Sequence, residues 1–280
     1  MTNNTAIIGA TNQLTIVKQV DFGLYLDGGE LGEILLPKKF APKQFEIGEQ
    51  LTVFVYLHSD DKVIATTQTP LAKVGEFANL EVVAVNRIGA FLNWGLDKDL
   101  LVPFSEQKRK LEVGQRHIVY VYIDRVDRRI TASAKIDKFL DQTPARYQQG
   151  QQVNLIIAGR SDLGFKAIIN NQHYGVLYPD EVFEYLSIGS HKLGYIKQVR
   201  SDGKLDLTLA RPAAEQRDEL SSRILHQLEK NGGYLAISDK SAPELIYKKF
   251  RVSKRIYKQT LGGLMKQGLI TIEPQGIRLK

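Results

Sequence analysis

The sequence predicts a mainly β protein, with three small β-barrels in tandem followed by a C-terminal α+β domain. Two observations support this fold class. A unit of roughly 65 residues occurs three times, and after Pro212 the spacing of apolar residues changes from 2 to about 3.6. The expected divisions are barrels at residues 1–70, 71–136 and 151–211, a linker at 137–150, and the α+β domain at 212–280.

Two glycines, each preceded by an apolar or aromatic residue, mark the repeated unit. The first pairs are Phe22-Gly23, Ile88-Gly89 and Leu163-Gly164. The second pairs follow 25 residues later in every copy, at Ile47-Gly48, Val113-Gly114 and Ile188-Gly189. Between them lies an apolar run ending near a proline, at residues 34–37, 100–103 and 175–179. Markers that keep one register three times indicate a structural repeat.

Each unit has the composition of short β-strands. Runs of β-branched and aromatic residues follow the second glycine, at residues 53–57, 119–123 and 193–196. Each run leads into a polar turn, at 59–62, 124–129 and 201–204, and then into another strand, at 63–66, 130–133 and 205–209. About five short strands in roughly 65 residues, with glycines where strands must bend, are typical of a small closed barrel.

The motifs of the first unit resemble the RNA-binding OB-fold module of ribosomal protein S1. They are Phe22-Gly23-Leu24-Tyr25-Leu26, Leu35-Leu36-Pro37 and Ile47-Gly48-Glu49, and the second unit is similar along residues 100–106. The resemblance covers about 1–70, 71–136 and 151–211, and it implies three tandem S1-type OB-fold barrels. The segment 137–150 is polar, contains Pro144, and is predicted to be a linker with a helical start at 136–140.

The last seventy residues predict three helices and a β-hairpin. Leu220, Ile224 and Leu228 recur at helical spacing, and Asn231-Gly232-Gly233 ends that helix. A capping box at residues 241–244 predicts a second helix, with Leu245, Ile246 and Phe250 on its apolar face. The third helix is expected from Ser253 to Gln267, and its predicted inward residues are Ile256, Tyr257, Leu261, Leu264 and Met265. Strands at 269–272 and 277–280 complete the order of a winged helix.

Three S1-type repeats followed by a winged helix resemble the conserved virulence factor B family along nearly the whole chain. That family is regarded as RNA-binding and regulatory. The resemblance therefore implies a protein that binds single-stranded RNA and acts in post-transcriptional gene regulation.

Strand parity predicts which aromatic rings face outward. If Leu24 and Leu26 fill the first barrel, Tyr25 must point out, and the same parity places Leu92 and Trp94 inside and Phe91 outside in the second. Bases of single-stranded RNA stack on such rings without sequence readout. Phe22 is expected to join Tyr25. The alternative is that Tyr25 and Phe91 pack against a neighbouring repeat.

The third unit departs from this pattern. Lys166 holds its outward position, Leu163 replaces the leading aromatic, and Phe165 falls on the inner parity. Tyr178 stands where the S1 module has a histidine, and Pro37 and Pro103 hold that place in the other units. The sequence thus predicts a phosphate contact from Lys166 and a base stacked on Tyr178; weak binding, or none, is the alternative.

Basic residues supply the remaining candidate RNA contacts. Lys62, Arg129 and Lys204 begin the last strand of their units, where the S1 module commonly has an arginine beside the RNA groove. The chain has a net charge of +7, and residues 213–280 hold 13 basic against 7 acidic side chains. Within that region Lys254, Arg255 and Lys258 lie on the third helix, which a helix-turn-helix protein uses for recognition.

Catalysis is not predicted, and neither is a metal or a cofactor. Cysteine is absent, and five histidines are scattered without metal-ligand spacing, with His173 and His226 expected at the surface. Asp60, Asp61, Asp124 and Asp127 fall in predicted turns, where acidic residues are common. No signal peptide and no apolar run of about 20 residues is seen, so a cytoplasmic protein without membrane contact is expected.

Two other functions remain open at this stage. The first is a transcriptional regulator that binds double-stranded DNA through the winged helix. The second is a non-catalytic assembly protein, in which the barrels or the winged helix bind other proteins.

Overall fold

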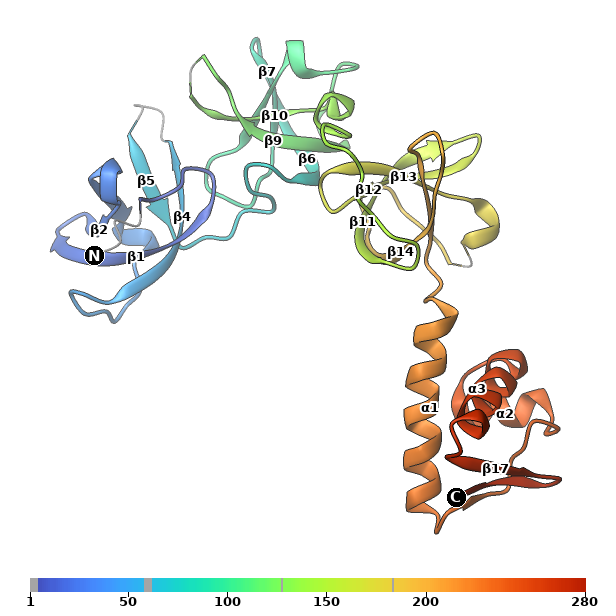
Figure 1. The fold of residues 1–280 in the computed structure, drawn as a ribbon. Coiled ribbons are helices and arrows are strands. Elements are labelled where there is room, and N and C mark those ends of the chain that lie inside the picture. The colour runs from blue at the N-terminus through green and yellow to red at the C-terminus, as the bar shows by residue number, and fades with distance from the viewer. Residues whose placement is uncertain (1–4, 58–61, 127, 183) are drawn as a thin grey trace.

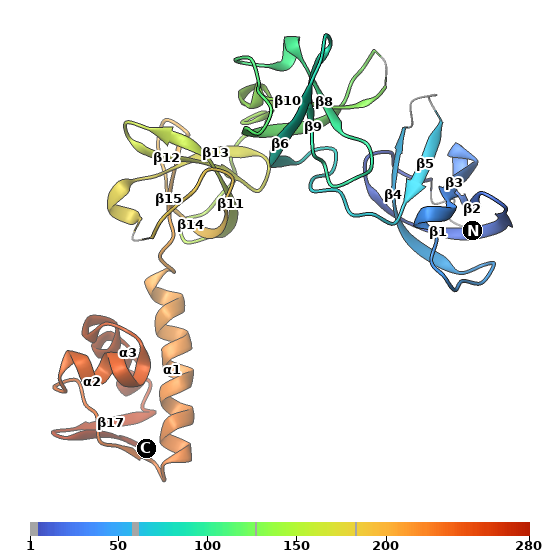
Figure 2. The same cartoon turned by 180° about the vertical axis from the view of Figure 1, so that it is seen from behind.

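The computed structural model describes residues 5–57, 62–126, 128–182 and 184–280. Asp60, Asp61 and Asp127, for which turns were predicted, lie outside the described residues. The predicted fold class is confirmed: three five-stranded β-barrels precede an α+β winged helix. Figures 1 and 2 show the barrels side by side in chain order, with barrel 2 in the middle and helix α1 leading away from barrel 3.

Barrel 1 is a closed barrel with the strand order β1-β2-β3-β5-β4. Its strands are β1 (Thr11–Val20), β2 (Gly23–Asp27), β3 (Glu33–Pro37), β4 (Gln50–Leu57) and β5 (Val63–Thr66). Strands β3 and β5 pair in parallel, and alternate residues such as Leu24, Leu26, Val53 and Val55 fill the interior. The outer faces of β2 and β3 form one surface, whereas Ile64 on the outer face of β5 packs against the core of barrel 2.

Barrel 3 repeats this closed arrangement, while in barrel 2 the end strands β8 and β10 lie side by side without forming a strand ladder among the described residues. The strands of barrel 2 are β6 (Phe77–Val85), β7 (Gly89–Leu92), β8 (Leu100–Pro103), β9 (Arg116–Ile123) and β10 (Ile130–Ser133), in the order β10-β9-β6-β7-β8. Barrel 3 is closed and consists of β11 (Gln152–Ser161), β12 (Gly164–Ile169), β13 (His173–Leu177), β14 (His191–Val199) and β15 (Leu205–Thr208). One-turn 3-10 helices follow the third strand of each barrel, at Lys38–Phe40, Phe104–Glu106 and Pro179–Glu181.

The first glycine of each repeat is required because two strands approach closely there. A Cβ atom on Gly23, Gly89 or Gly164 would lie 2.2–2.3 Å from the carbonyl oxygen of Leu36, Val102 or Leu177 respectively. Real Cβ atoms do not approach backbone oxygen so closely, so any side chain would push the second and third strands apart. The repeated motif therefore has a packing cause that is independent of ligand binding.

Gly89→Ala is expected to destabilise barrel 2 by about 1–3 kcal/mol or more, because the new methyl group overlaps the Val102 carbonyl oxygen. Urea denaturation followed by circular dichroism measures the loss as a lower midpoint. An unchanged midpoint would mean that β7 and β8 are further apart in solution.

Barrels 1 and 2 are joined by aromatic side chains on the outer face of β4. Phe54 and Tyr56 point away from the barrel 1 interior and belong to the core cluster of barrel 2. The Phe54 and Trp94 rings meet edge to face at 5.5 Å, and Trp94 Nε1 donates a 2.6 Å hydrogen bond to the Ala72 carbonyl oxygen. Trp94 is buried, as predicted, but part of its cover comes from the neighbouring barrel.

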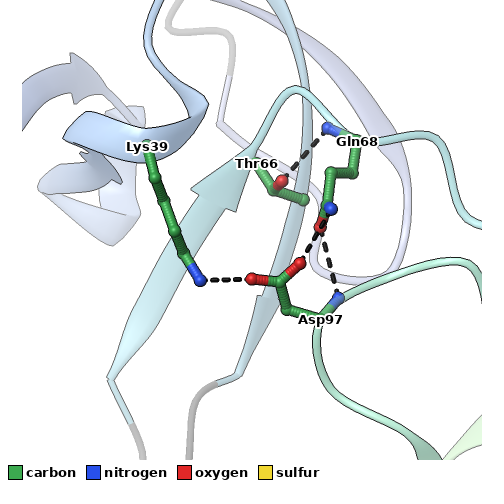
Figure 3. Close-up of polar contacts among 4 residues, drawn as sticks. All are labelled: Lys39, Thr66, Gln68 and Asp97. Atoms are coloured by element: carbon green, nitrogen blue, oxygen red, sulfur yellow. Dashed lines mark hydrogen bonds and ion pairs between the residues drawn. The ribbon is translucent and has the colours of Figure 1, made fainter.

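Polar contacts at Asp97 complete this joint (Figure 3). Its carboxylate forms an ion pair with Lys39 of barrel 1 and accepts a 2.8 Å hydrogen bond from Gln68 Nε2. The Asp97 backbone N–H in turn donates to Gln68 Oε1 at 3.2 Å. The Lys39 and Gln68 contacts hold the pKa of the Asp97 carboxyl below its ordinary value. Because these groups are exposed, the apolar contact contributes most of the stability of the joint.

The start of the predicted linker packs between barrels 2 and 3, whereas most of residues 141–149 are exposed. A 3-10 helix, η4 (Ile136–Phe139), begins it, and Leu140 is 2% exposed. One buried cluster includes Ile136 and Leu140 together with outward-facing side chains of β6, β9, β11 and β12. The Tyr174 hydroxyl donates a 2.9 Å hydrogen bond to the Asp137 carboxylate. Burial, and to a smaller extent Asp137, raises the pKa of Tyr174.

His173 is buried, so its predicted surface position is wrong. It is 3% exposed, its Nε2 donates to the Thr143 carbonyl oxygen at 2.7 Å, and its Nδ1 accepts from the Tyr147 hydroxyl at 3.0 Å. Both partners come from the linker. The histidine therefore fastens that segment onto barrel 3.

The C-terminal domain has the predicted winged-helix order. It contains α1 (Ala213–Lys230), β16 (Tyr234–Leu235), α2 (Pro243–Phe250), α3 (Lys254–Lys266), β17 (Ile270–Glu273) and β18 (Gly276–Leu279). The short strand β16, which was not predicted, joins the hairpin in the order β16-β18-β17. Leu220, Ile224 and Leu228 of α1 are fully buried in its core, and α2 and α3 lie beside the C-terminal half of α1 (Figure 1).

Three predicted details of this domain are wrong. Leu245 is 57% exposed and Met265 is 49% exposed, because each lies just outside the helix face that meets the core. The capping box does not form, since α2 begins after Ala242 with Pro243 in its first turn. The Ser241 hydroxyl instead accepts a 2.9 Å hydrogen bond from the Ser238 backbone N–H.

Gly263→Ala is expected to stabilise the winged helix by about 1 kcal/mol. A Cβ atom there would have no heavy atom within 4 Å, and alanine restricts the unfolded chain while favouring the helix. Differential scanning calorimetry would detect a higher melting temperature. The same chemical change has the opposite sign at Gly89, so the two variants serve as controls for each other.

Candidate nucleic-acid interface

In barrel 1 an aromatic and basic cluster lies on the outer face of β1 and β2 and at the turn between them. Tyr25 is half-buried between the fully buried Leu24 and Leu26, and it pairs across the strands with Leu35. Phe22 is 58% exposed and meets the Tyr25 ring edge to face at 6.4 Å. Lys18 Nζ lies 4.8 Å from the centre of the Tyr25 ring. Stacking surface and positive charge therefore occupy the same face.

Barrel 2 presents the equivalent position with a second ring. Phe91 is half-buried between the fully buried Ala90 and Leu92, and it pairs with Leu101, as Tyr25 pairs with Leu35. Arg129 comes directly before β10 and lines the same pocket as Phe91. The predicted parity is confirmed in both barrels, and the structure brings Phe91 and Arg129 together. Both rings stay half-buried, and Phe91 shares its pocket with Tyr56 and Leu57 of barrel 1.

Barrel 3 replaces the ring with charge, as the sequence indicates. Lys166 is exposed at the corresponding position of β12 and pairs with Val176 of β13. Lys204 precedes β15 and lines one pocket of about 440 Å³ with Lys166, together with Asp141 and Asp202. Lys204 also forms a 3.4 Å ion pair with Asp202. Two carboxylates thus accompany the two lysines in this pocket, and a phosphate contact from Lys166 stays a prediction.

Tyr178 and Lys62 lie at the edges of these faces. The Tyr178 hydroxyl donates a 3.2 Å hydrogen bond to Asp206 of β15, which holds its ring against barrel 3. Phe165 packs on the core of that barrel, in agreement with its predicted inner parity, and Leu163 is 61% exposed. Lys62 is exposed directly before β5. The binding roles of Tyr178 and Lys62 stay predictions.

The winged-helix candidates lie on α3, in a different domain from the barrel faces. Arg255 and Lys258 are exposed, whereas Lys254 is half-buried and donates a 3.4 Å hydrogen bond to the Lys240 carbonyl oxygen. Ser253 caps the helix by accepting from the Ile256 backbone N–H. Two side chains of the predicted set are thus available to an anionic partner.

The contribution of barrel 1 to the barrel 2 surface was not predicted from the sequence. Tyr56 and Leu57 at the end of β4 line the Phe91 pocket. A signal for this was present, because residues 53–57 are apolar on both strand faces, as expected for a strand covered on both sides. Among the described residues, no group of three or more His, Asp or Glu side chains could hold a metal, and no helix is long and apolar enough to cross a membrane.

Two protein-family models match the chain, one over the first two barrels and one over the C-terminal domain. An S1 domain model matches residues 8–68 and 74–135, and a CvfB-like winged helix domain model matches residues 222–279. The first two barrels and the C-terminal domain are therefore an S1 pair and a winged helix.

Several proteins resemble the chain along most of its length. The uncharacterized protein YitL of Bacillus subtilis is 28% identical over 272 residues, covering 92% of this chain and 88% of that protein. Conserved virulence factor B of Staphylococcus epidermidis is 25% identical and covers 98% and 95%. A solved multidomain protein with nucleic acid binding domains from Streptococcus pneumoniae is 24% identical with a TM-score of 0.40, covering 98% of both chains.

Proposed function

We propose that this chain, which belongs to the conserved virulence factor B family through its S1 domains and its CvfB-like winged helix, binds single-stranded RNA and regulates genes after transcription. Nucleic acid binding follows from the domain families themselves. The preference for single-stranded RNA, the regulatory role, the cytoplasmic location and the absence of catalysis belong to the proposal.

One observation carries the proposal: the second strand turns the same position outward in all three barrels, and an aromatic ring occupies it in two of them. Tyr25 and Phe91 each sit between buried neighbours on an outer face, and Lys166 holds the position in barrel 3. Rings of this kind stack on bases for about 1–3 kcal/mol each, which a duplex does not permit because its bases are already stacked. The face therefore supports binding of an unpaired strand with little sequence preference.

The winged helix favours a second candidate function, binding of double-stranded DNA. The supporting observation is the exposure of Arg255 and Lys258 on α3, the position of a recognition helix. In our proposal these residues add phosphate contacts to an RNA already held by the barrels. As a DNA regulator, the protein would instead depend on them for its main affinity.

Fluorescence anisotropy with three labelled probes distinguishes the two functions. The probes are a single-stranded RNA, the same sequence as single-stranded DNA, and a DNA duplex, titrated between about 50 and 200 mM salt. We expect RNA to bind most tightly, with affinity falling steeply as salt rises. Arg255→Ala/Lys258→Ala should weaken RNA binding modestly and reduce its salt dependence. Tighter binding of the duplex, abolished by that double variant, would establish the DNA regulator instead.

A further inference from the structure

A pocket of about 140 Å³ opens where barrel 1 meets the nucleic-acid face of barrel 2. Its lining includes Tyr56 from β4 of barrel 1 and, from barrel 2, Phe91, Trp94, Leu101, Arg129 and Thr131. Pockets for drug-sized ligands measure about 300–1,000 Å³, so this one suits a single small ring. Aromatic and aliphatic side chains line it, together with the cationic Lys98 and Arg129 and the anionic Asp99.

Tyr56 gives this pocket an unused polar group. The residue is 5% exposed, and its hydroxyl makes no hydrogen bond with any part of the chain that the structure describes. The hydroxyl is not among the fully buried polar atoms that lack a partner, so it keeps contact with the space of the pocket, where a ligand can reach it. Burial, with the Asp97 charge as a smaller cause, raises the pKa of the hydroxyl, which therefore stays protonated and able to donate.

We propose that this pocket receives one base of the bound RNA strand, which stacks on Phe91 and accepts a hydrogen bond from the Tyr56 hydroxyl. The inference rests on the proposed function and makes it more specific. A base has a flat apolar face and polar edges. The Phe91 ring can stack on the face, and the Tyr56 hydroxyl can donate to an acceptor on the edge. The positive charge of Lys98 and Arg129 attracts the phosphates on either side of that base.

The location of the pocket connects base binding to the arrangement of the barrels. Tyr56 belongs to barrel 1 and Phe91 to barrel 2, so the pocket exists only while the two are docked through Phe54, Trp94 and Asp97. A base in this pocket contacts both barrels. Stacking alone does not distinguish one base from another, and the hydrogen bond to Tyr56 adds a preference among the bases.

Tyr56→Phe tests the inference, because it removes only the hydroxyl and keeps the buried ring. The probes are labelled oligo(A), oligo(C) and oligo(U) of about 12 nucleotides, within the range that OB-folds cover, and an abasic ribose-phosphate oligomer of equal length. We expect the variant to lose about three- to tenfold affinity for the best-bound homopolymer, as one neutral hydrogen bond would provide. Its affinity for the abasic probe should not change. Tyr195→Phe, at an equally buried tyrosine of barrel 3, is the matched control and should bind like the wild type.

Trp94 provides a second measurement, because it is the single tryptophan of the chain and lines the pocket. A base that enters the pocket should change its emission in the wild type, and by less in Tyr56→Phe. The inference is overturned, while the proposed function stands, if the wild type binds RNA through Phe91 but Tyr56→Phe binds every probe unchanged. If the wild type binds no single-stranded RNA, the proposed function fails and the inference fails with it.

Discussion

Replacing both Tyr25 and Phe91 with alanine is expected to weaken binding of single-stranded RNA by at least roughly 30-fold. Each ring contributes about 1–3 kcal/mol when a base stacks on it, so two rings together contribute about 2–6 kcal/mol. Both side chains lie on outer barrel faces, between buried neighbours that the substitutions leave in place. Fluorescence anisotropy gives the change in Kd, and circular dichroism verifies that the variant is folded.

The same titration repeated at several salt concentrations tells stacking from charge. Because neither ring releases a counterion, the slope of affinity against salt should stay that of the wild type. Tyr185→Ala is the matched control, since that ring is 90% exposed but does not lie on the second, third or fifth strand of its barrel. Unchanged RNA affinity in the double variant would leave the barrels without a stacking role and would favour the assembly protein.

The three barrels were predictable because each repeat has a local physical requirement that its sequence must meet. Gly23, Gly89 and Gly164 stand where a strand passes too close to a carbonyl oxygen for any side chain. Outward orientation of Tyr25 and Phe91 was predictable for a similar reason, since parity depends only on neighbouring residues. Such features are visible in one unit and become convincing when three units repeat them.

The joints between barrels were not predictable, because they depend on which units come to lie beside each other. Phe54 and Ile168 are outward-facing and apolar, and each is buried only by a neighbouring barrel or the linker. The sequence signals that such faces need a cover, but it does not identify the cover. The same limit applies to the Tyr56 side of the Phe91 pocket, which comes from a different barrel.

The wrong predictions in the winged helix have local causes. Leu245 and Met265 were placed inward because they are apolar and close to the expected stripe, yet one position on a helix corresponds to about 100° of rotation. The predicted capping box failed because Ser241 bonds to the preceding turn, leaving Ala242 at the start of α2. The possible helix starts and buried faces differ little in free energy, so a single motif does not decide between them.

Phe54→Ala is expected to lower the free energy of unfolding by about 3–5 kcal/mol and to loosen the joint between barrels 1 and 2. The ring is 2% exposed and packs edge to face on Trp94, so its removal leaves a cavity that the surrounding barrels fill only in part. Urea denaturation measures the loss of stability. Trp94, the single tryptophan, reports on the joint directly: its emission should shift to longer wavelength as water reaches the indole.

Val53→Ala is the control for this effect, because the neighbouring residue faces the interior of barrel 1. It should also destabilise the protein, by less because fewer atoms are removed, while the native Trp94 emission stays unchanged. The two substitutions thus separate loss of barrel 1 packing from loss of the joint. If the joint exists in solution, the emission should shift in Phe54→Ala and not in Val53→Ala. If that variant keeps the wild-type emission, the barrels are not docked through Phe54 and Trp94, and a pocket shared between Tyr56 and Phe91 cannot form.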